Sequence, residues 1–169
     1  MRGIMSVIIT KDVSFVIKRT SVLILTVLLL IFTVSCSESS YSEATWDGYK
    51  NKPFIDFLDI FVEKNLARQN EKGMNVSWTI SYADNWKESS KLDKDDLGED
   101  EQMRTYTVDV VLEHNGEIEN NQMYFFMGYT PCEQKLTVKG IKMVEDGNEM
   151  LEIKGEEAEK QLKEMAKKL

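Results

Sequence analysis

The stretch Asn75-Val76-Ser77-Trp78-Thr79-Ile80-Ser81-Tyr82 decides the fold class of this 169-residue chain. Apolar side chains at 76, 78, 80 and 82 alternate with polar side chains at 75, 77, 79 and 81. This period of two is typical of a β-strand with one apolar face. Such a face needs a second layer to cover it, and the preceding residues supply one.

Residues 53–72 predict an amphipathic helix directly before this strand. Pro53 suits the first helical position because it lacks the N–H that a first turn leaves unpaired. Gly73 follows as the expected left-handed cap. One face of the helix holds its apolar residues, which are Phe54, Ile55, Phe57, Leu58, Phe61, Val62 and Leu66. A face this broad predicts that the helix lies on the sheet.

Three further segments extend the predicted sheet. Residues 105–112 alternate like the first strand, and a turn signal follows them at residues 114–116. Residues 122–129 are apolar on both faces, which indicates a central strand covered by the helix on one side and by another segment on the other. The strand that begins at Leu136 changes phase at Gly140, so we expect a β-bulge there.

The chain closes with a turn, a short strand and a second helix. Asp146 and Gly147 predict the turn, and residues 151–153 predict an edge strand. From Glu156 to Leu169 acidic residues come first and basic residues last, which matches the helix dipole. The predicted fold is therefore α+β: an N-terminal amphipathic helix packed on a curved antiparallel sheet of three to five strands, plus a C-terminal helix.

This order of elements resembles the cystatin-like and NTF2-like folds, in which one helix lies across a curved antiparallel sheet. The resemblance covers residues 53–153 and suggests small Gram-positive lipoproteins with a cystatin-like domain. An NTF2-like fold can also form a cup that binds or transforms a small ligand. Asp109 and Tyr124 would then be the expected acid and tyrosine of the cup. Fold alone does not choose between these functions.

A second motif lies near the start of the chain. An uncharged apolar run at residues 22–34 follows a basic pair at 18–19 and leads through Ser35 to Cys36. This pattern is typical of a secretion signal, because the run is too short to prefer spanning a bilayer. The motif Thr-Val-Ser-Cys at residues 33–36 resembles the lipobox of bacterial lipoprotein precursors. In that family the cysteine receives a diacylglycerol thioether and becomes the first residue of the mature protein.

The lipobox resemblance implies a location and an organisation. The mature protein would be held at the extracytoplasmic face of the cell membrane by lipid chains on Cys36, with palmitate among them. An ordinary signal peptide or an anchor helix is the alternative. The expected parts are a signal peptide at 1–35 (translation starting at Met1, Met5 or Val16), a lipidated cysteine and flexible tether at 36–50 and one domain at 51–169. Two aromatic residues of the tether, Trp46 and Tyr49, are expected to dock on the first helix.

Charge and motifs limit the function. Residues 1–35 hold four basic residues and one acidic residue, so the totals of 21 and 29 fall to 17 and 28 beyond them, a net charge of about −11. Such a surface repels phosphate backbones, so nucleic acid is not an expected partner. No catalytic triad, phosphate loop or zinc spacing is present, and no cofactor is predicted. We expect a binding module that contacts a protein or another component of the cell envelope.

The candidate contact surface is the acidic loop, residues 83–102. Its length and charge indicate a mobile loop or a binding element. With Asp93 as first ligand of an EF-hand, Leu97 and Arg104 would occupy the fifth and twelfth positions, so two calcium ligands are missing and no metal site is predicted. We expect a partner contact through Trp86, Asp93, Asp95, Asp96, Glu99, Asp100 and Glu101.

The second cysteine, Cys132, offers little chemistry by itself. With Cys36 lipidated, no intramolecular disulfide is expected. A nucleophilic thiolate would need a base, and His114 is the one histidine of the chain. Nothing in the sequence brings these residues together, so we expect an inert thiol.

Overall fold

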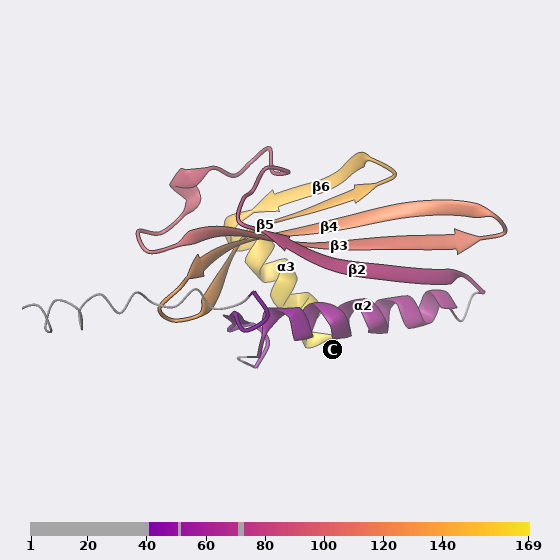
Figure 1. Cartoon of the computed structure of the whole chain (residues 1–169), viewed down its shortest axis with the longest axis horizontal. Helices are drawn as coiled ribbons and strands as arrows, with labels where there is room; N and C mark the ends of the chain where they lie inside the picture. Colours follow the sequence, from indigo (N-terminus) through magenta and orange to yellow (C-terminus); the bar gives the residue numbers. More distant parts are fainter. Residues whose placement is uncertain (1–40, 51, 71–72) are drawn as a thin grey trace, which may run out of the picture. The chain divides into compact units, whose positions relative to one another are not determined.

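The computed structural model describes residues 41–169, apart from residue 51 and residues 71–72. The predicted signal peptide, Cys36 and the first residues of the predicted tether lie outside this part. The described elements, shown in Figure 1, are β1 (Thr45–Trp46), α2 (Phe54–Asn70), β2 (Asn75–Ala83), the 3-10 helix η1 (Lys94–Asp96), β3 (Gln102–His114), β4 (Glu117–Thr130), β5 (Lys135–Glu145), β6 (Asn148–Lys154) and α3 (Gly155–Lys167).

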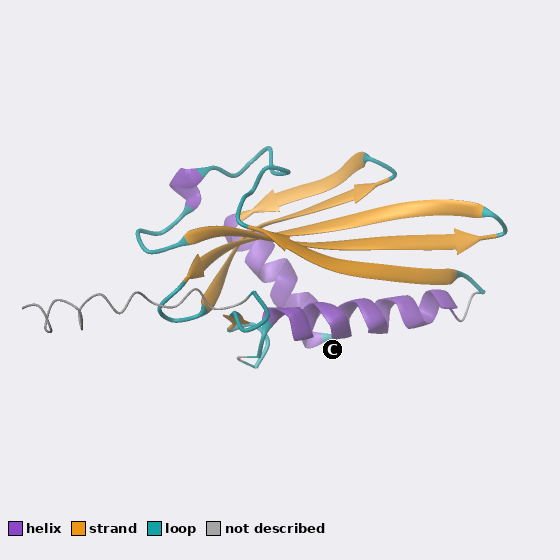
Figure 2. Ribbon diagram, in the orientation of Figure 1, coloured by secondary structure: helices purple, strands orange, loops and turns teal. Residues whose placement is uncertain are grey.

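The strands form one curled, mixed sheet in the order β1-β5-β4-β3-β2, with β6 also paired to β5 (Figure 2). All pairings are antiparallel except that of β1 with β5, which is parallel. The predicted α+β class is therefore confirmed. The predicted sheet was incomplete, because residues 45–46 add a parallel strand that makes it six-stranded and mixed.

The predicted turns form where residues can adopt a positive φ. Asn115 and Gly116 join β3 to β4 with φ of 52° and 84°, and Asp146 and Gly147 join β5 to β6 with φ of 46° and 79°. Positive φ at both central residues is the geometry that two-residue hairpins favour, because its twist matches that of the strands. These turns fix the pairing registers of the long strands.

The predicted bulge in β5 is also present. Phe126 of β4 pairs with Gly140, but the next residue, Met127, pairs with Val138, so Lys139 is an extra residue in β5. The extra residue restores the apolar phase, since Val138 and Ile141 are both buried in the core. A change of phase in the sequence was sufficient to locate it.

α2 packs on the inner face of the sheet, which is the face that carries Phe125 and Met127. Phe54 and Phe57 of α2 have no exposed surface. The Phe54 ring lies 5.1 Å from the Tyr106 ring and 5.8 Å from the Phe125 ring, both in edge-on geometry. The predicted helix-on-sheet packing is confirmed.

Residues 41–50 belong to the folded domain. Trp46 is buried, and the rings of Trp46 and Tyr49 each lie 5.4 Å from the Phe57 ring. The Thr45 N–H donates to the Gln134 carbonyl at 2.9 Å, which ties β1 to the start of β5. The expected docking of the two aromatic residues is confirmed. The predicted flexible tether is wrong for residues 41–50, because aromatic burial and strand pairing fix them.

α3 completes the core. Ala158 and Leu162 are fully buried in the same cluster as the phenylalanines of α2, and the helix packs against β5 and β6. Neither α2 nor α3, the two α-helices of the described residues, is long and apolar enough to cross a membrane.

Candidate functional site

The acidic loop docks on the outer face of the sheet, the face opposite α2. This face carries Phe126, which is fully buried although it lies outside the inner core. A Cβ placed on Gly140 would lie 2.8 Å from Leu92 of the loop and 3.4 Å from Phe126. Glycine at this position therefore lets the loop reach the sheet. The segment that was predicted to cover the second face of the central strand is the acidic loop itself.

Glu152 of β6 binds the first half of the loop. Its carboxylate accepts the Ser89 hydroxyl at 2.6 Å and the Ser90 and Lys91 N–H groups at 3.0 Å each. Burial raises the pKa of Glu152, but the hydrogen bonds from Ser89, Ser90 and Lys91 outweigh burial and bring it below its usual value. The charged carboxylate is thus the form that holds the loop.

Glu101, near the other end of the loop, fixes that end to β5. Its carboxylate lies 2.6 Å from the Lys139 ammonium, accepts the Gly98 N–H at 2.6 Å, and also accepts the Thr137 hydroxyl. Burial raises the pKa of Glu101, but these three donors outweigh burial and bring the pKa below its usual value. The predicted contact role for Glu101 is therefore replaced by a structural one.

Trp86 is also structural. The residue is 4% exposed, and its indole N–H donates to the Arg104 carbonyl at 3.2 Å. The Arg104 guanidinium, itself buried, lies 4.1 Å from the Tyr41 ring centre and 3.3 Å from the Tyr129 ring centre. The prediction that Trp86 offers its ring to a partner is wrong, because its side chain is buried in the domain.

Asp93 and Asp96 cap the 3-10 helix η1. The Asp93 carboxylate accepts the Asp95 N–H at 2.9 Å, and the Asp96 carboxylate accepts the Asp93 N–H at 3.1 Å, which forms a capping box. Asp96 also lies 3.5 Å from the Lys154 ammonium. In the part of the chain that the structure describes, no three His, Cys, Asp or Glu side chains converge in a metal-ligand arrangement.

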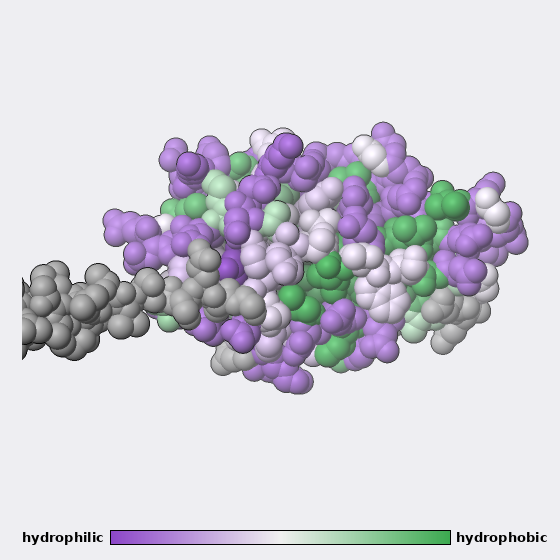
Figure 3. Space-filling model, viewed as in Figure 1, coloured by the Kyte–Doolittle hydropathy of each residue, from purple (hydrophilic) through white to green (hydrophobic). Residues whose placement is uncertain are grey.

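The predicted contact residues thus divide into two groups. Trp86, Asp96 and Glu101 hold the loop against the sheet. The side chains that face solvent are those of Asp93, Asp95, Glu99 and Asp100, which we name the exposed acidic surface. The end of the molecule that carries this loop is mostly hydrophilic in Figure 3, with a few hydrophobic patches among the hydrophilic residues.

Sequence reasoning missed the residues that dock the loop. Glu152 interrupts the apolar residues of β6, and an acid on a strand is usually read as solvent-exposed. Gly128 and Gly140 were clearer signals, because glycine inside a strand often marks close approach by another segment. Side chains of the loop do approach both glycines, Glu101 at Gly128 and Leu92 at Gly140.

The residues expected for a ligand cup lie elsewhere. Asp109 and Tyr124 are on the outer face, where the Gln122 amide donates to Asp109 at 2.7 Å and accepts from the Tyr124 hydroxyl at 3.1 Å. Between α2 and the sheet the space is filled by buried aromatic rings, among them Phe54 and Phe125. The structure therefore does not place this pair in a cup.

Cys132 and His114 are not brought together. His114 ends β3 at the turn before β4, and Cys132 lies in the turn after β4, so the whole length of that strand separates them. Cys132 is disulfide-bonded in the structure, which differs from the expected inert thiol.

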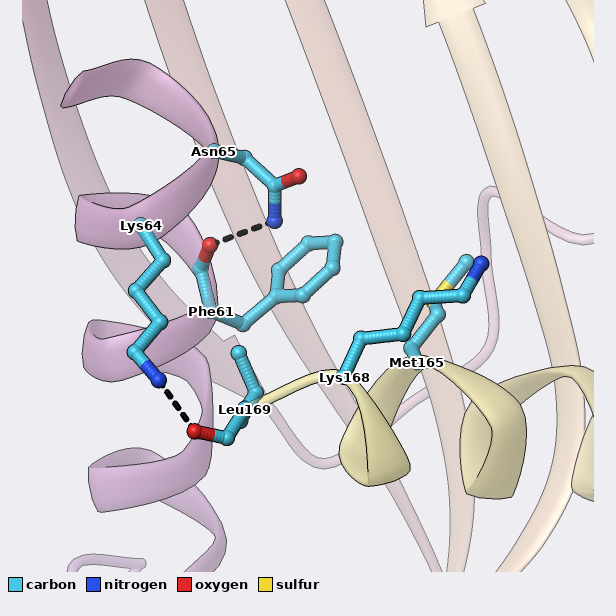
Figure 4. Close-up of a pocket in the computed structure, with 6 residues that line it drawn as sticks. All are labelled: Phe61, Lys64, Asn65, Met165, Lys168 and Leu169. Atoms are coloured by element: carbon cyan, nitrogen blue, oxygen red, sulfur yellow. Dashed lines mark hydrogen bonds between the residues drawn. The ribbon is translucent and has the colours of Figure 1, made fainter. Parts of the chain in front are cut away.

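A separate pocket of about 490 Å³ lies between α2 and α3. Figure 4 shows its lining, with Phe61 and Met165 on opposite sides and the Lys64 ammonium donating to the Leu169 carbonyl. Asn65 and Lys168 complete it. No lining residue carries a carboxylate or imidazole side chain, so the pocket contains no general base of those kinds.

Comparisons with protein-family models, curated proteins and solved structures gave no match to this chain. Function therefore has to be inferred from the residues of the chain itself.

Proposed function

We propose that this chain is a lipid-anchored protein of the cell envelope whose domain acts by contacting another protein or envelope component. The anchor is supported by the apolar run at residues 22–34 and by the lipobox-like motif that ends at Cys36. We include in the proposal a cystatin-like or NTF2-like fold, which is supported by α2 lying across a curled sheet.

The filled interior is the observation that favours an interaction module over a ligand cup. Small-ligand sites are concave, with a few polar groups converging on a cavity. Here Phe57 and Tyr106 occupy the space under α2 and have no exposed surface. Binding through the surface remains, and the exposed acidic surface is the part of the predicted contact set that a partner could reach.

The exposed acidic surface is presented on a fixed loop. Glu152 holds the first half of the loop, Glu101 fixes its last residues to β5, and Trp86 near its start is buried. A surface that is ordered before binding loses less conformational entropy when a partner docks. Its charge would attract a basic partner and would make the association rate depend on salt.

A neutral loop of the same shape tests the contact. Asp93→Asn, Asp95→Asn, Glu99→Gln and Asp100→Asn remove four charges together, and asparagine at 93 keeps a good helix cap. Photo-crosslinking in cells from a site in the loop should lose its partner product in this variant. A matched control, Glu156→Gln, removes an exposed charge at the start of α3. Unchanged crosslinking in the neutral loop would contradict contact through the acidic surface.

The anchor is tested separately at Cys36. Replacing it with alanine should abolish incorporation of a fatty-acid analogue and leave the precursor uncleaved. Cys132→Ala is the matched control and should label at least as strongly as the wild type. Undiminished labelling of the Cys36→Ala variant would overturn the lipid assignment.

The disulfide at Cys132 provides a second way to test the anchor. The chain has two cysteines, and one sulfur atom cannot belong to both a thioether and a disulfide. A lipid on Cys36 therefore competes with any disulfide between Cys36 and Cys132. Mass spectrometry of the processed protein distinguishes them: a diacylglycerol-modified Cys36 peptide supports the anchor, and a cystine-linked pair of peptides contradicts it.

A further inference from the structure

The two edges of the sheet are built differently. The edge formed by β1 and β6 is protected: β1 has two residues, and β6 contains Glu149, Glu152 and Lys154. The pairing of β6 with β5 also contains a register shift, and the acidic loop binds β6 through Glu152. Short strands, charges, irregular pairing and covering loops are the devices by which proteins prevent edge-to-edge association.

The β2 edge lacks the charges, the shortness and the irregular pairing of the other edge, although α2 runs along it (Figure 1) and Tyr41 stacks on Tyr82 with 3.9 Å between the ring centres. Its nine residues, Asn75–Ala83, contain no charge, no proline and no glycine, and they pair with β3 without a register shift. Every other described strand longer than two residues contains charged side chains. Among the described residues, β2 pairs with β3 alone. A long, regular and uncharged edge is a template for another strand.

Side-chain exposure points to the same edge. Trp78 is 40% exposed and Tyr82 is 55% exposed, two of the four large hydrophobic side chains most exposed in the described part. They share a face with Val76 and Ile80, which pack against the core. Ser77, on the opposite face, is exposed. α2 runs along β2 in Figure 1, and the band that holds these two elements is paler in Figure 3 than the loop end.

We propose that β2 is a homodimer interface, at which a second copy of this chain adds its own β2 antiparallel to the first. A two-fold axis perpendicular to the sheet, midway between the Thr79 residues of the two copies, creates this pairing. Residues whose numbers sum to 158 then lie opposite each other, so all nine residues are paired. Such an isologous interface closes on itself and forms a dimer, not a fibre.

The sequence of β2 is complementary to itself in this register. On the apolar face, Trp78 lies opposite Ile80 of the second copy, and Val76 lies opposite Tyr82, and each pair occurs twice. Aromatic residues opposite β-branched residues are favourable cross-strand pairs. On the polar face Ser77 lies opposite Ser81 and Thr79 opposite itself, so hydroxyl groups meet hydroxyl groups.

Charge favours this edge as the contact between two copies. The chain carries a net charge of −8, so most surfaces of two copies repel each other. β2 is nine residues without charge, and in the proposed register its first flanking acid, Asp84, lies opposite the apolar Met74. Within the paired segments of the two copies, no charged residue therefore lies opposite another charged residue. The inference does not depend on the anchor at Cys36.

Introducing charged residues at Ser77 and Ser81 tests both the dimer and its register. Sedimentation of the purified full chain in detergent should give a dimer for the wild type. Ser77→Lys with Ser81→Lys places lysine opposite lysine twice and should raise the dimer dissociation constant about tenfold or more. Ser77→Lys with Ser81→Glu places lysine opposite glutamate twice and should restore the dimer. Both variants change the same exposed positions, and circular dichroism of each checks that it is folded.

Three results would overturn the proposal. One is a wild-type chain that sediments as a monomer at every concentration. Another is a double-lysine variant that dimerises as tightly as the wild type. The third is a photo-crosslinking residue at Thr79 that captures only a different protein, which would assign the edge to a foreign strand. None of these results bears on lipid labelling at Cys36, so this inference and the proposed anchor can fail independently.

Discussion

Glu101 and Lys139 form an ion pair, with 2.6 Å between Oε2 and Nζ, in the space that glycine leaves at position 128 on the outer face of the sheet. A Cβ on Gly128 would lie 2.6 Å from the Lys139 side chain and 2.7 Å from the Glu101 carboxyl carbon. Both side chains are largely buried, at 10% and 19% exposure for Glu101 and Lys139. The pair therefore links the end of the acidic loop to the bulge of β5.

Glu101→Gln should destabilise the folded protein by about 1 to 3 kcal/mol at pH 7, because it removes a charged hydrogen-bond acceptor from three donors. The pKa of Glu101 in the folded protein lies below the usual 4.5, so the charged form favours folding. This stability is fully present above about pH 4.5 and is lost as the pH falls through the lower, folded value. Urea unfolding at pH 7 and at pH 3 should differ less in the variant than in the wild type.

Glu99→Gln is the matched control for that experiment. Glu99 is exposed, two residues away on the same loop. Its replacement should change stability by less than about 0.5 kcal/mol, as is usual for surface substitutions. Equal effects of the two substitutions would show that the ion pair does not hold the loop.

Gly140→Val should release the acidic loop from the sheet. The new side chain would collide with Leu92 of the loop and would lie about as close to the Ile153 carbonyl, which is 3.0 Å from a Cβ at this position. Overpacking of this kind costs about 1 to 3 kcal/mol. Amide hydrogen exchange should speed up in the loop first. Gly147→Asn is the control, because its φ of 79° suits asparagine and no atom lies within 4 Å of the added Cβ.

Phe57→Ala should reduce stability by about 3 to 5 kcal/mol, because it opens a cavity in a fully packed core. Its ring contacts those of Trp46, Tyr49 and Phe54. Phe61→Ala should cost less, since Phe61 is half-buried and lines the pocket between α2 and α3. The midpoint of urea unfolding measures both. A loss at Phe57 well under 1 kcal/mol would contradict the helix-on-sheet packing.

Deleting residues 89–101 should destabilise the domain, although long surface loops are usually dispensable. The deletion would uncover Phe126 and remove the Ser89 and Lys91 donors from the Glu152 carboxylate. A buried carboxylate without donors is costly. Unfolding in urea and binding of a dye to exposed apolar surface would both report the change. A deletion variant as stable as the wild type would show that the loop only rests on the sheet.

The elements of the fold could be predicted from the sequence because their signals are local. The alternation of apolar and polar residues predicted β2, the apolar face of residues 53–72 predicted α2, and the change of phase at Gly140 predicted the bulge. Each signal depends on residues within one element, where side-chain direction follows the backbone period. The turns at residues 115–116 and 146–147 were predictable for the same reason, since the need for positive φ is met by particular residue types.

The candidate site could not be predicted in the same way. The acids of the acidic loop look alike in the sequence, but Glu101 is held by Lys139 while Asp95 faces solvent. Trp86 could equally have faced a partner. Which acid is buried depends on donors far along the chain, as with Ser89 and Glu152, which are 63 positions apart.

By itself the sequence determined the class of fold, the order of its helices and long strands and the lipobox-like motif at Cys36, because period, turn chemistry and motif spacing are set by neighbouring residues. The tertiary structure decided that residues 41–50 join the domain, that the acidic loop is fixed to the sheet, and that β2 forms an edge without charge. These properties depend on which distant residues meet, and the packing of the whole chain brings them together.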